Sequence, residues 1–94
     1  MGVIFSIRYH SKVVTEDIPK LSTLDKHRVK LAIERKLTSQ PEVFGVPLRK
    51  SLKGYRKLRV GDYRVIFRIE NTTIKIFVIQ HRSVVYKNAE KRLK

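Results

Sequence analysis

Apolar and polar side chains alternate most clearly over residues 57–68. This segment is predicted to form two strands joined at Gly61-Asp62, because glycine tolerates the positive φ of a two-residue hairpin turn. Side chains alternate across a strand, which predicts one face with Arg64, Ile66 and Arg68 and the other with Tyr63, Val65, Phe67 and Ile69. Before the turn, one face is predicted to hold Tyr55, Lys57 and Arg59, and the opposite one Arg56 and Leu58. Because a core strand does not bury Lys or Arg without partners, one side of the hairpin must be solvated or bound to something negative.

Similar periodicities predict the other elements. A capping box at residues 22–25 marks the start of the main helix, whose apolar stripe is expected to lie on a sheet. The last strand is predicted to place Ile74, Ile76 and Val78 on one face and Lys75, Phe77 and Ile79 on the other. In chain order we expect a strand at 3–9, a short helix within 11–21 interrupted by Pro19, a helix at 23–39, a connection at 41–54, strands at about 55–60, 62–70 and 73–81, and a weakly helical tail from Ser83 to Leu93.

This order of elements predicts an α+β fold. Two N-terminal helices would pack on one face of a small, mainly antiparallel four-stranded sheet, and the opposite face would carry the basic residues. The chain of 94 residues is long enough for one modest core, and it contains no repeat or internal boundary. A single domain, residues 1–94, is therefore expected.

Charge adds a functional constraint. The chain has 22 Lys and Arg against 8 Asp and Glu, a net charge of +14. Residues 48–94 hold 14 basic and 3 acidic side chains (+11), whereas residues 1–47 hold 8 and 5 (+3). Such an imbalance favours a polyanionic partner, nucleic acid first, with a membrane surface or an acidic protein as alternatives. With no cysteine, no signal-peptide pattern and no run of transmembrane length, a soluble cytoplasmic protein is expected.

Several classes of chemistry are poorly supported. His10, His27 and His81 lack the short spacing of metal ligands, and neither a zinc nor a calcium motif occurs. No glycine-rich phosphate loop is present. The basic half has only Asp62, Glu70 and Glu90 as carboxylates, which disfavours a two-carboxylate mechanism. We therefore expect no metal and no small-molecule cofactor.

The remaining chemistry-bearing residues suit RNA. They lie on or just after the predicted hairpins and are Lys57, Arg59, Arg64, Arg68, His81, Arg82 and Tyr86. RNA carries its own nucleophile, the ribose 2′-OH, so a metal-free enzyme needs only a base, an acid and charge stabilisation. Closely spaced cations lower a lysine's pKa, and arginines hold phosphates through bidentate contacts. Binding to the phosphate backbone without catalysis accounts for the same charges, so both interpretations stay open.

Three segments resemble the RelE/ParE superfamily of bacterial toxins. They are "LKGYRKLRVGDYRVIF" (52–67), "IKIFVIQHR" (74–82) and "HRSVVYKNAEKRL" (81–93). The resemblance implies a RelE-like fold and a toxin of a type II toxin–antitoxin pair. In the RelE branch such a toxin enters the ribosomal A site and cuts mRNA by 2′-OH attack, whereas in the ParE branch it poisons DNA gyrase.

The resemblance also implies roles for individual residues. Arg64, after Gly-Asp-Tyr, matches a phosphate-stabilising arginine, and Lys57 matches a basic catalytic residue. Tyr55 stands where the RelE pattern has a second lysine, so the identity of the general base stays open, with His81 as a further candidate. The expected catalytic set is Lys57, Arg64, His81, Arg82 and Tyr86, and the expected RNA-binding set is Lys53, Arg56, Arg59 and Arg68.

The function implied by these matches is a ribosome-dependent, metal-independent endoribonuclease that cleaves mRNA and inhibits translation. Its alternatives are a gyrase inhibitor without nuclease activity and a non-catalytic RNA-binding module. Expected partners are the ribosome, mRNA and a cognate antitoxin with an acidic or amphipathic segment that folds on binding. No membrane partner is expected.

Overall fold

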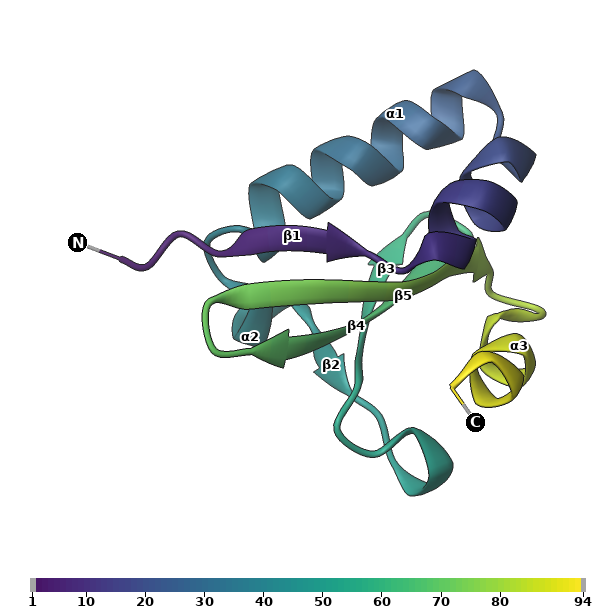
Figure 1. The fold of residues 1–94 in the computed structure, drawn as a ribbon. Helices are drawn as coiled ribbons and strands as arrows, with labels where there is room; N and C mark the ends of the chain where they lie inside the picture. The colour runs from purple at the N-terminus through teal and green to yellow at the C-terminus, as the bar shows by residue number, and fades with distance from the viewer. Residues whose placement is uncertain (1, 94) are drawn as a thin grey trace.

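The computed structural model describes residues 2–93 and has one five-stranded mixed sheet in the order β1-β5-β4-β3-β2 (Figure 1). β1 runs parallel to β5, and the other neighbouring pairs are antiparallel. The strands are β1 (Ser6–Tyr9), β2 (Val46–Pro47), β3 (Arg56–Val60), β4 (Tyr63–Glu70) and β5 (Thr73–His81). The predicted α+β class is confirmed, but the prediction of four strands is wrong, because β2 forms within the expected connection 41–54 and pairs with β3.

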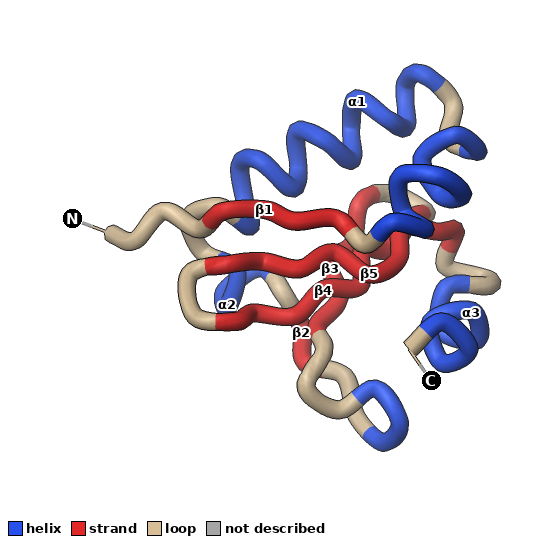
Figure 2. Tube along the Cα trace, viewed as in Figure 1, coloured by secondary structure: helices blue, strands red, loops and turns tan. Residues whose placement is uncertain are grey.

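Helical segments cover both faces of this sheet. They are the turns η1 (Val13–Asp17) and η2 (Ile18–Lys20), the helix α1 (Thr23–Ala32) continued by η3 (Ile33–Leu37), the short α2 (Pro41–Phe44) and η4 (Lys50–Leu52), and the C-terminal α3 (Val85–Arg92). Figure 1 shows α1 along one side of the sheet and α3 on the other side, and Figure 2 shows the loop with η4 extending beyond β2. The prediction of helices on one face only is therefore incomplete, because α3 covers part of the opposite face.

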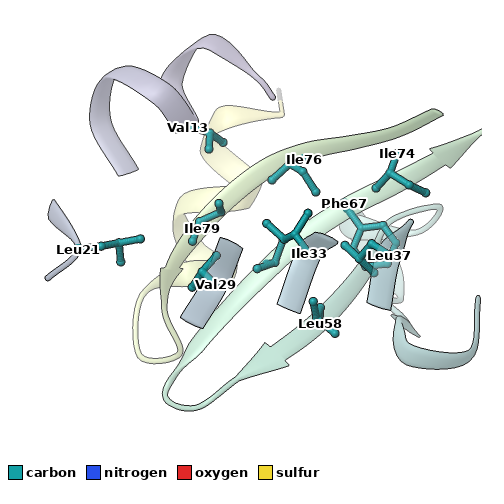
Figure 3. Packing of buried hydrophobic residues seen from close by; sticks show 11 residues of the cluster. Val13, Leu21, Val29, Ile33, Leu37, Leu58, Phe67, Ile74, Ile76 and Ile79 are labelled. Atoms are coloured by element: carbon teal, nitrogen blue, oxygen red, sulfur yellow. The ribbon is translucent and has the colours of Figure 1, made fainter. Parts of the chain in front are cut away.

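The main core lies between the sheet and α1–η3. Ser22 caps this helix, since its Oγ accepts a hydrogen bond of 3.1 Å from the Asp25 backbone N–H. The stripe Val29, Ile33 and Leu37 is 0–3% exposed, and it points onto β4 and β5 (Figure 3). The periodicity of the sequence thus predicted this interface correctly.

A second, smaller core lies on the opposite face, where Val85 and Ala89 of α3 pack on Leu52, Ile66 and Val78. Ile66 is buried on this face, while its neighbours Val65 and Phe67 are buried in the main core. The predicted alternation along β4 is therefore confirmed.

One irregularity interrupts the last hairpin. The pairing runs from Ile66 with Val78 directly to Phe67 with Ile76, so Phe77 is an extra residue in β5, a β-bulge. Beyond a bulge, every side chain of the strand changes face. Val78 accordingly joins the small core and Ile79 joins the main core, opposite to the prediction for both residues.

Candidate functional site

Three cations and a tyrosine meet on the face of the β3–β4 hairpin that α3 partly covers. Arg59 lies directly across the strands from Arg64, and Lys57 precedes Arg59 by two residues in β3. The Lys57 Nζ is 5.6 Å from the centroid of the Tyr86 ring, within the range of a cation–π contact. We call Lys57, Arg59, Arg64 and Tyr86 the Lys57 cluster.

The hairpin turn fixes the position of Arg64. Gly61 has φ +59°, the left-handed conformation that two-residue turns require. The Arg64 side chain folds over this turn, and its Nη1 donates hydrogen bonds of 2.9 Å to the carbonyls of Gly61 and Tyr63. A guanidinium has five N–H donors, so Nε and Nη2 remain to contact a bound phosphate.

The charge of the cluster is uncompensated within residues 2–93. Like charges directly opposite each other destabilise a strand pair, and Arg59 and Arg64 are such a pair. The ion pairs in the described part of the chain are Arg68–Glu70, Lys75–Glu70 and Arg92–Asp17. None of them includes a member of the Lys57 cluster. The positive charges of the cluster are therefore available to an external anion.

Tyr86 is positioned by α3. Its neighbours Val85 and Ala89 are fully buried in the small core, and the Tyr86 ring packs against the same core. This packing holds the Tyr86 ring near Lys57 of β3. The cluster thus combines residues from β3, β4 and α3 that are separated by up to 29 positions in the sequence (86 − 57).

His81 does not join the Lys57 cluster. His81 pairs with Tyr63, and the two rings lie edge to face with centroids 5.7 Å apart. The pair borders a hollow of about 280 Å³ beside α1, on the opposite face from Arg64. The bulge at Phe77 explains this placement, because it reverses the faces of residues 78–81. Arg82 is exposed, and its backbone N–H donates to the Asp62 carbonyl at 2.8 Å.

The other expected RNA-binding residues are dispersed. Arg56 faces the α1 side, where its Nη1 donates to the carbonyl of Gly45 at 2.9 Å. Arg68 lies on the same face as the cluster, about 13 Å from Arg64 along β4 at the rise of a strand. It is the diagonal cross-strand neighbour of Lys57, whose direct partner is Ile66. It pairs with Glu70 and lies over the rings of Tyr55 and Phe77. Lys53 is exposed at the end of η4.

Glu70 is the carboxylate that pairs with Arg68 and Lys75. Hydrogen bonds from Lys75 and Arg68 hold the pKa of the Glu70 carboxyl below its ordinary value. Arg68 and Lys75 therefore meet a charged carboxylate at neutral pH, in contrast to the cations of the Lys57 cluster. Among residues 2–93, no three His, Asp or Glu side chains lie close enough to share a metal ion.

Sequence reasoning missed the polar residues that hold α3 in place. Gln80 is the cross-strand partner of Arg64, and its Oε1 accepts a hydrogen bond of 2.6 Å from the Asn88 Nδ2 of α3. Its Nε2 donates to Asp17 Oδ1 at 2.9 Å. No local pattern marks these residues, because their contacts join segments distant in sequence.

Comparisons with known proteins agree with this architecture. A family model described as the ParE toxin of the type II toxin–antitoxin system parDE matches residues 7–86. The Toxin RelG of Mycobacterium tuberculosis (strain ATCC 25618 / H37Rv) is 40% identical over 53 residues, which are 54% of this chain and 61% of RelG. The match thus spans less than two thirds of that relative's length.

Solved structures share most of the fold. The toxin–antitoxin complex RelBE2 from Mycobacterium tuberculosis contains a chain with a TM-score of 0.79 and 30% identity, and the match covers 86% of this chain and 94% of that one. The RelB–RelE complex from Methanococcus jannaschii gives a TM-score of 0.66 at 23% identity, covering 85% and 95% of the two chains. The second likeness supports the fold alone.

The fold and these matches define the class of protein as a toxin of a type II toxin–antitoxin system. The chain belongs to the ParE toxin family, within the RelE/ParE superfamily. Within residues 2–93, no helix is long and apolar enough to cross a membrane.

Proposed function

We propose that this toxin is a metal-independent endoribonuclease of the RelE type, which cuts mRNA in the ribosomal A site and thereby stops translation in the cytoplasm. The observation that carries the proposal is the Lys57 cluster: two opposed arginines and a lysine without a carboxylate partner among residues 2–93, beside a tyrosine ring. Such a group suits a substrate that supplies both negative charge and a nucleophile, and RNA does both.

In the proposed reaction, the 2′-oxygen of one ribose attacks the adjacent phosphorus while the bond from phosphorus to the 5′-oxygen of the next nucleotide breaks. A base takes the proton of the 2′-OH, and an acid gives one to the leaving 5′-oxygen. The products are a 2′,3′-cyclic phosphate and a free 5′-OH. Arg64 and Arg59 would hold the non-bridging phosphate oxygens, whose charge grows in the transition state.

Lys57 and Tyr86 are the groups beside the arginines that transfer protons, and we assign the base and the acid to this pair. Tyr86 also offers a ring on which a base can stack. His81 is a weaker candidate for either role than the sequence suggested, since it faces the α1 side of the sheet together with Tyr63. Arg56 and Lys53 would contribute to RNA binding at a distance from the reacting phosphate. Arg68, diagonal to Lys57, and Arg82, whose backbone bonds the hairpin turn, would add contacts closer to it.

A translation extract tests this proposal. We expect wild-type protein to arrest synthesis and to produce new mRNA 3′ ends at A-site codons, mapped by primer extension. Lys57→Ala should lower the cleavage rate by about 10²–10⁴-fold, the usual contribution of a general acid or base. Lys12→Ala, which removes an exposed lysine outside the cluster, is the matched control and should cut like wild type. Arrest without new mRNA ends would overturn the proposal.

A second candidate function is inhibition of DNA gyrase, because the matched family model is that of the ParE toxin. This function uses the same fold and does not require the Lys57 cluster to be catalytic. It predicts that the purified toxin changes supercoiling or traps a cleavage complex with gyrase, while mRNA stays intact. A plain RNA-binding module would show neither effect, and its RNA affinity would fall steeply with salt.

We also propose a cognate antitoxin as the partner of the free toxin. The similar RelBE2 structure is a toxin–antitoxin complex, and the net charge of +14 would attract an acidic segment. An apolar hollow of about 270 Å³ between η2, α1 and the sheet is bordered by Lys26 and Lys30 and could accept such a segment. Affinity purification of the tagged toxin expressed from its native operon should recover the antitoxin in stoichiometric amount. Recovery of the toxin alone would contradict the proposal.

A further inference from the structure

A buried ion pair connects the first third of the chain to its last helix. Asp17, at the end of η1, is 2% exposed, and the Arg92 side chain of α3 is 7% exposed. The two residues are 75 positions apart. Arg92 Nη1 donates to Asp17 Oδ2 at 2.7 Å, and Nη2 donates to Oδ1 at 3.0 Å, a bidentate contact.

The same pair holds the backbone at the β-bulge and directly after it. Asp17 Oδ2 accepts the N–H of Ile79 at 2.9 Å, and Arg92 Nη1 donates to the carbonyl of Phe77 at 2.9 Å. Gln80 extends the network, since it bonds Asp17 on one side and Asn88 of α3 on the other. The network therefore fixes α3 to the part of β5 where the strand is irregular.

α3 depends on such contacts. It has eight residues and no side-chain hydrogen bond at its N-cap Val84, and helices this short are not stable in isolation. Its apolar contacts come mainly from Val85 and Ala89. Its polar anchors are Asn88 in the middle, Arg92 at the C-terminal end, and Glu90, which accepts a hydrogen bond of 2.7 Å from Ser51.

Apolar packing alone leaves a short helix free to slide or rotate, because hydrophobic contacts are not directional. The Asp17 carboxylate, in contrast, receives four hydrogen bonds from fixed directions, two from Arg92 and one each from Ile79 and Gln80. Replacement of a buried ion pair by apolar residues is often neutral for stability. Orientation of α3 is thus the property that this pair supplies and an apolar pair would not.

We infer that Asp17 and Arg92 are positioning residues, which orient α3 so that Tyr86 lies over Lys57. Neither side chain belongs to the Lys57 cluster, and both act on it through the helix. The effect on catalysis rests on the proposed function, whereas the effect on the position of Tyr86 does not.

Fluorine NMR of protein labelled with 3-fluorotyrosine tests the position directly. The chain has four tyrosines, and Tyr86→Phe identifies the resonance of Tyr86. We expect Arg92→Ala to shift or broaden this resonance while the others stay in place, and to speed amide exchange in α3 by about tenfold or more relative to β4. Lys91→Ala is the matched control, since it removes a neighbouring but exposed cation of α3.

Arg92→Lys serves as a second variant if Arg92→Ala does not fold. A lysine ammonium keeps the charge opposite Asp17, but it lacks the fork that spans both carboxylate oxygens and the Phe77 carbonyl. In Arg92→Lys the Tyr86 resonance should move in the same direction as in Arg92→Ala, but by a smaller amount. A folded Arg92 variant whose Tyr86 resonance and α3 exchange both equal those of wild type would overturn the inference.

Cleavage assays supply the functional readout. We expect Arg92→Ala to lower the rate of bound-substrate cleavage by about 100-fold, as small misplacements of catalytic groups do. RNA affinity should fall much less than the rate, because the phosphate-binding cations Lys57, Arg59 and Arg64 are on the sheet and only the stacking contact of Tyr86 is displaced. If wild type does not cut mRNA, the proposed nuclease function fails, and the fluorine result still decides whether the Asp17–Arg92 pair positions Tyr86. A parallel loss of affinity and rate would show a general structural defect and contradict the inference.

Discussion

Replacing Arg64 with alanine is expected to lower the rate of mRNA cleavage by about 10²–10³-fold, or about 3–4 kcal/mol of transition-state stabilisation. Arg64 is held against the hairpin turn by two hydrogen bonds to backbone carbonyls, so its remaining donors are already oriented when substrate arrives. Donors that need no reorganisation stabilise developing charge most effectively. A single-turnover assay on programmed ribosomes, with toxin in excess, measures this step.

Arg59 should contribute less than Arg64. It is exposed, and mobile surface cations bind phosphate without a fixed geometry. Arg59→Ala is therefore expected to weaken substrate binding more than it slows the bound complex. Arg35→Ala, which removes an exposed arginine on the helical side of the sheet, is the matched control. If Arg64→Ala and Arg35→Ala cut at the same rate, the Lys57 cluster is not the catalytic site.

The Lys57 cluster could be predicted from the sequence as far as β3 and β4 are concerned. Gly61 fixes the turn, the turn fixes the register, and the register decides that Lys57, Arg59 and Arg64 share a face. Each of these steps depends on residues a few positions apart. The cross-strand arrangement of the three cations can therefore be predicted from the sequence alone.

The position of His81 could not be predicted, because the bulge at Phe77 leaves no trace in the sequence. Residues 76–79 are all apolar, and both faces of β5 are covered in this region, one by α1 and η3 and the other by α3. A strand buried on both faces has no polar alternation that would reveal a change of register. Local patterns consequently placed Val78 and Ile79 on the wrong faces.

The strand β2 and the position of α3 could not be predicted for a related reason, although the sequence predicts a weakly helical tail from Ser83 to Leu93 that matches α3. β2 has only two residues and pairs with β3 across the loop that carries η4. The position of α3 depends on Asp17, an acidic residue of the N-terminal region that gives no sign in the sequence of its burial. Contacts between segments so distant in sequence follow from the assembled fold, not from local periodicity.

Asp17→Ala is expected to destabilise the protein by about 3–5 kcal/mol, the usual effect of removing one partner of a buried ion pair. The mutation leaves the Arg92 guanidinium buried without its counter-ion, and it removes the acceptor for the Ile79 N–H. Urea unfolding followed by far-UV circular dichroism measures the free energy of unfolding. For a domain of this size, the loss is a large fraction of the total stability.

A control and a double variant complete this test. The double variant separates the effect of the Asp17–Arg92 charges from that of their hydrogen bonds to the backbone. Glu16→Ala, at the exposed neighbouring acid, should change stability by less than about 0.5 kcal/mol. The double variant Asp17→Leu with Arg92→Met removes both charges and should recover part of the loss. It should not reach wild-type stability, because the Ile79 N–H and the Phe77 carbonyl then lose their partners, at about 1–3 kcal/mol for each buried group. A loss below about 1 kcal/mol in Asp17→Ala would show that the pair is hydrated in solution, and α3 would then be held by its apolar contacts alone.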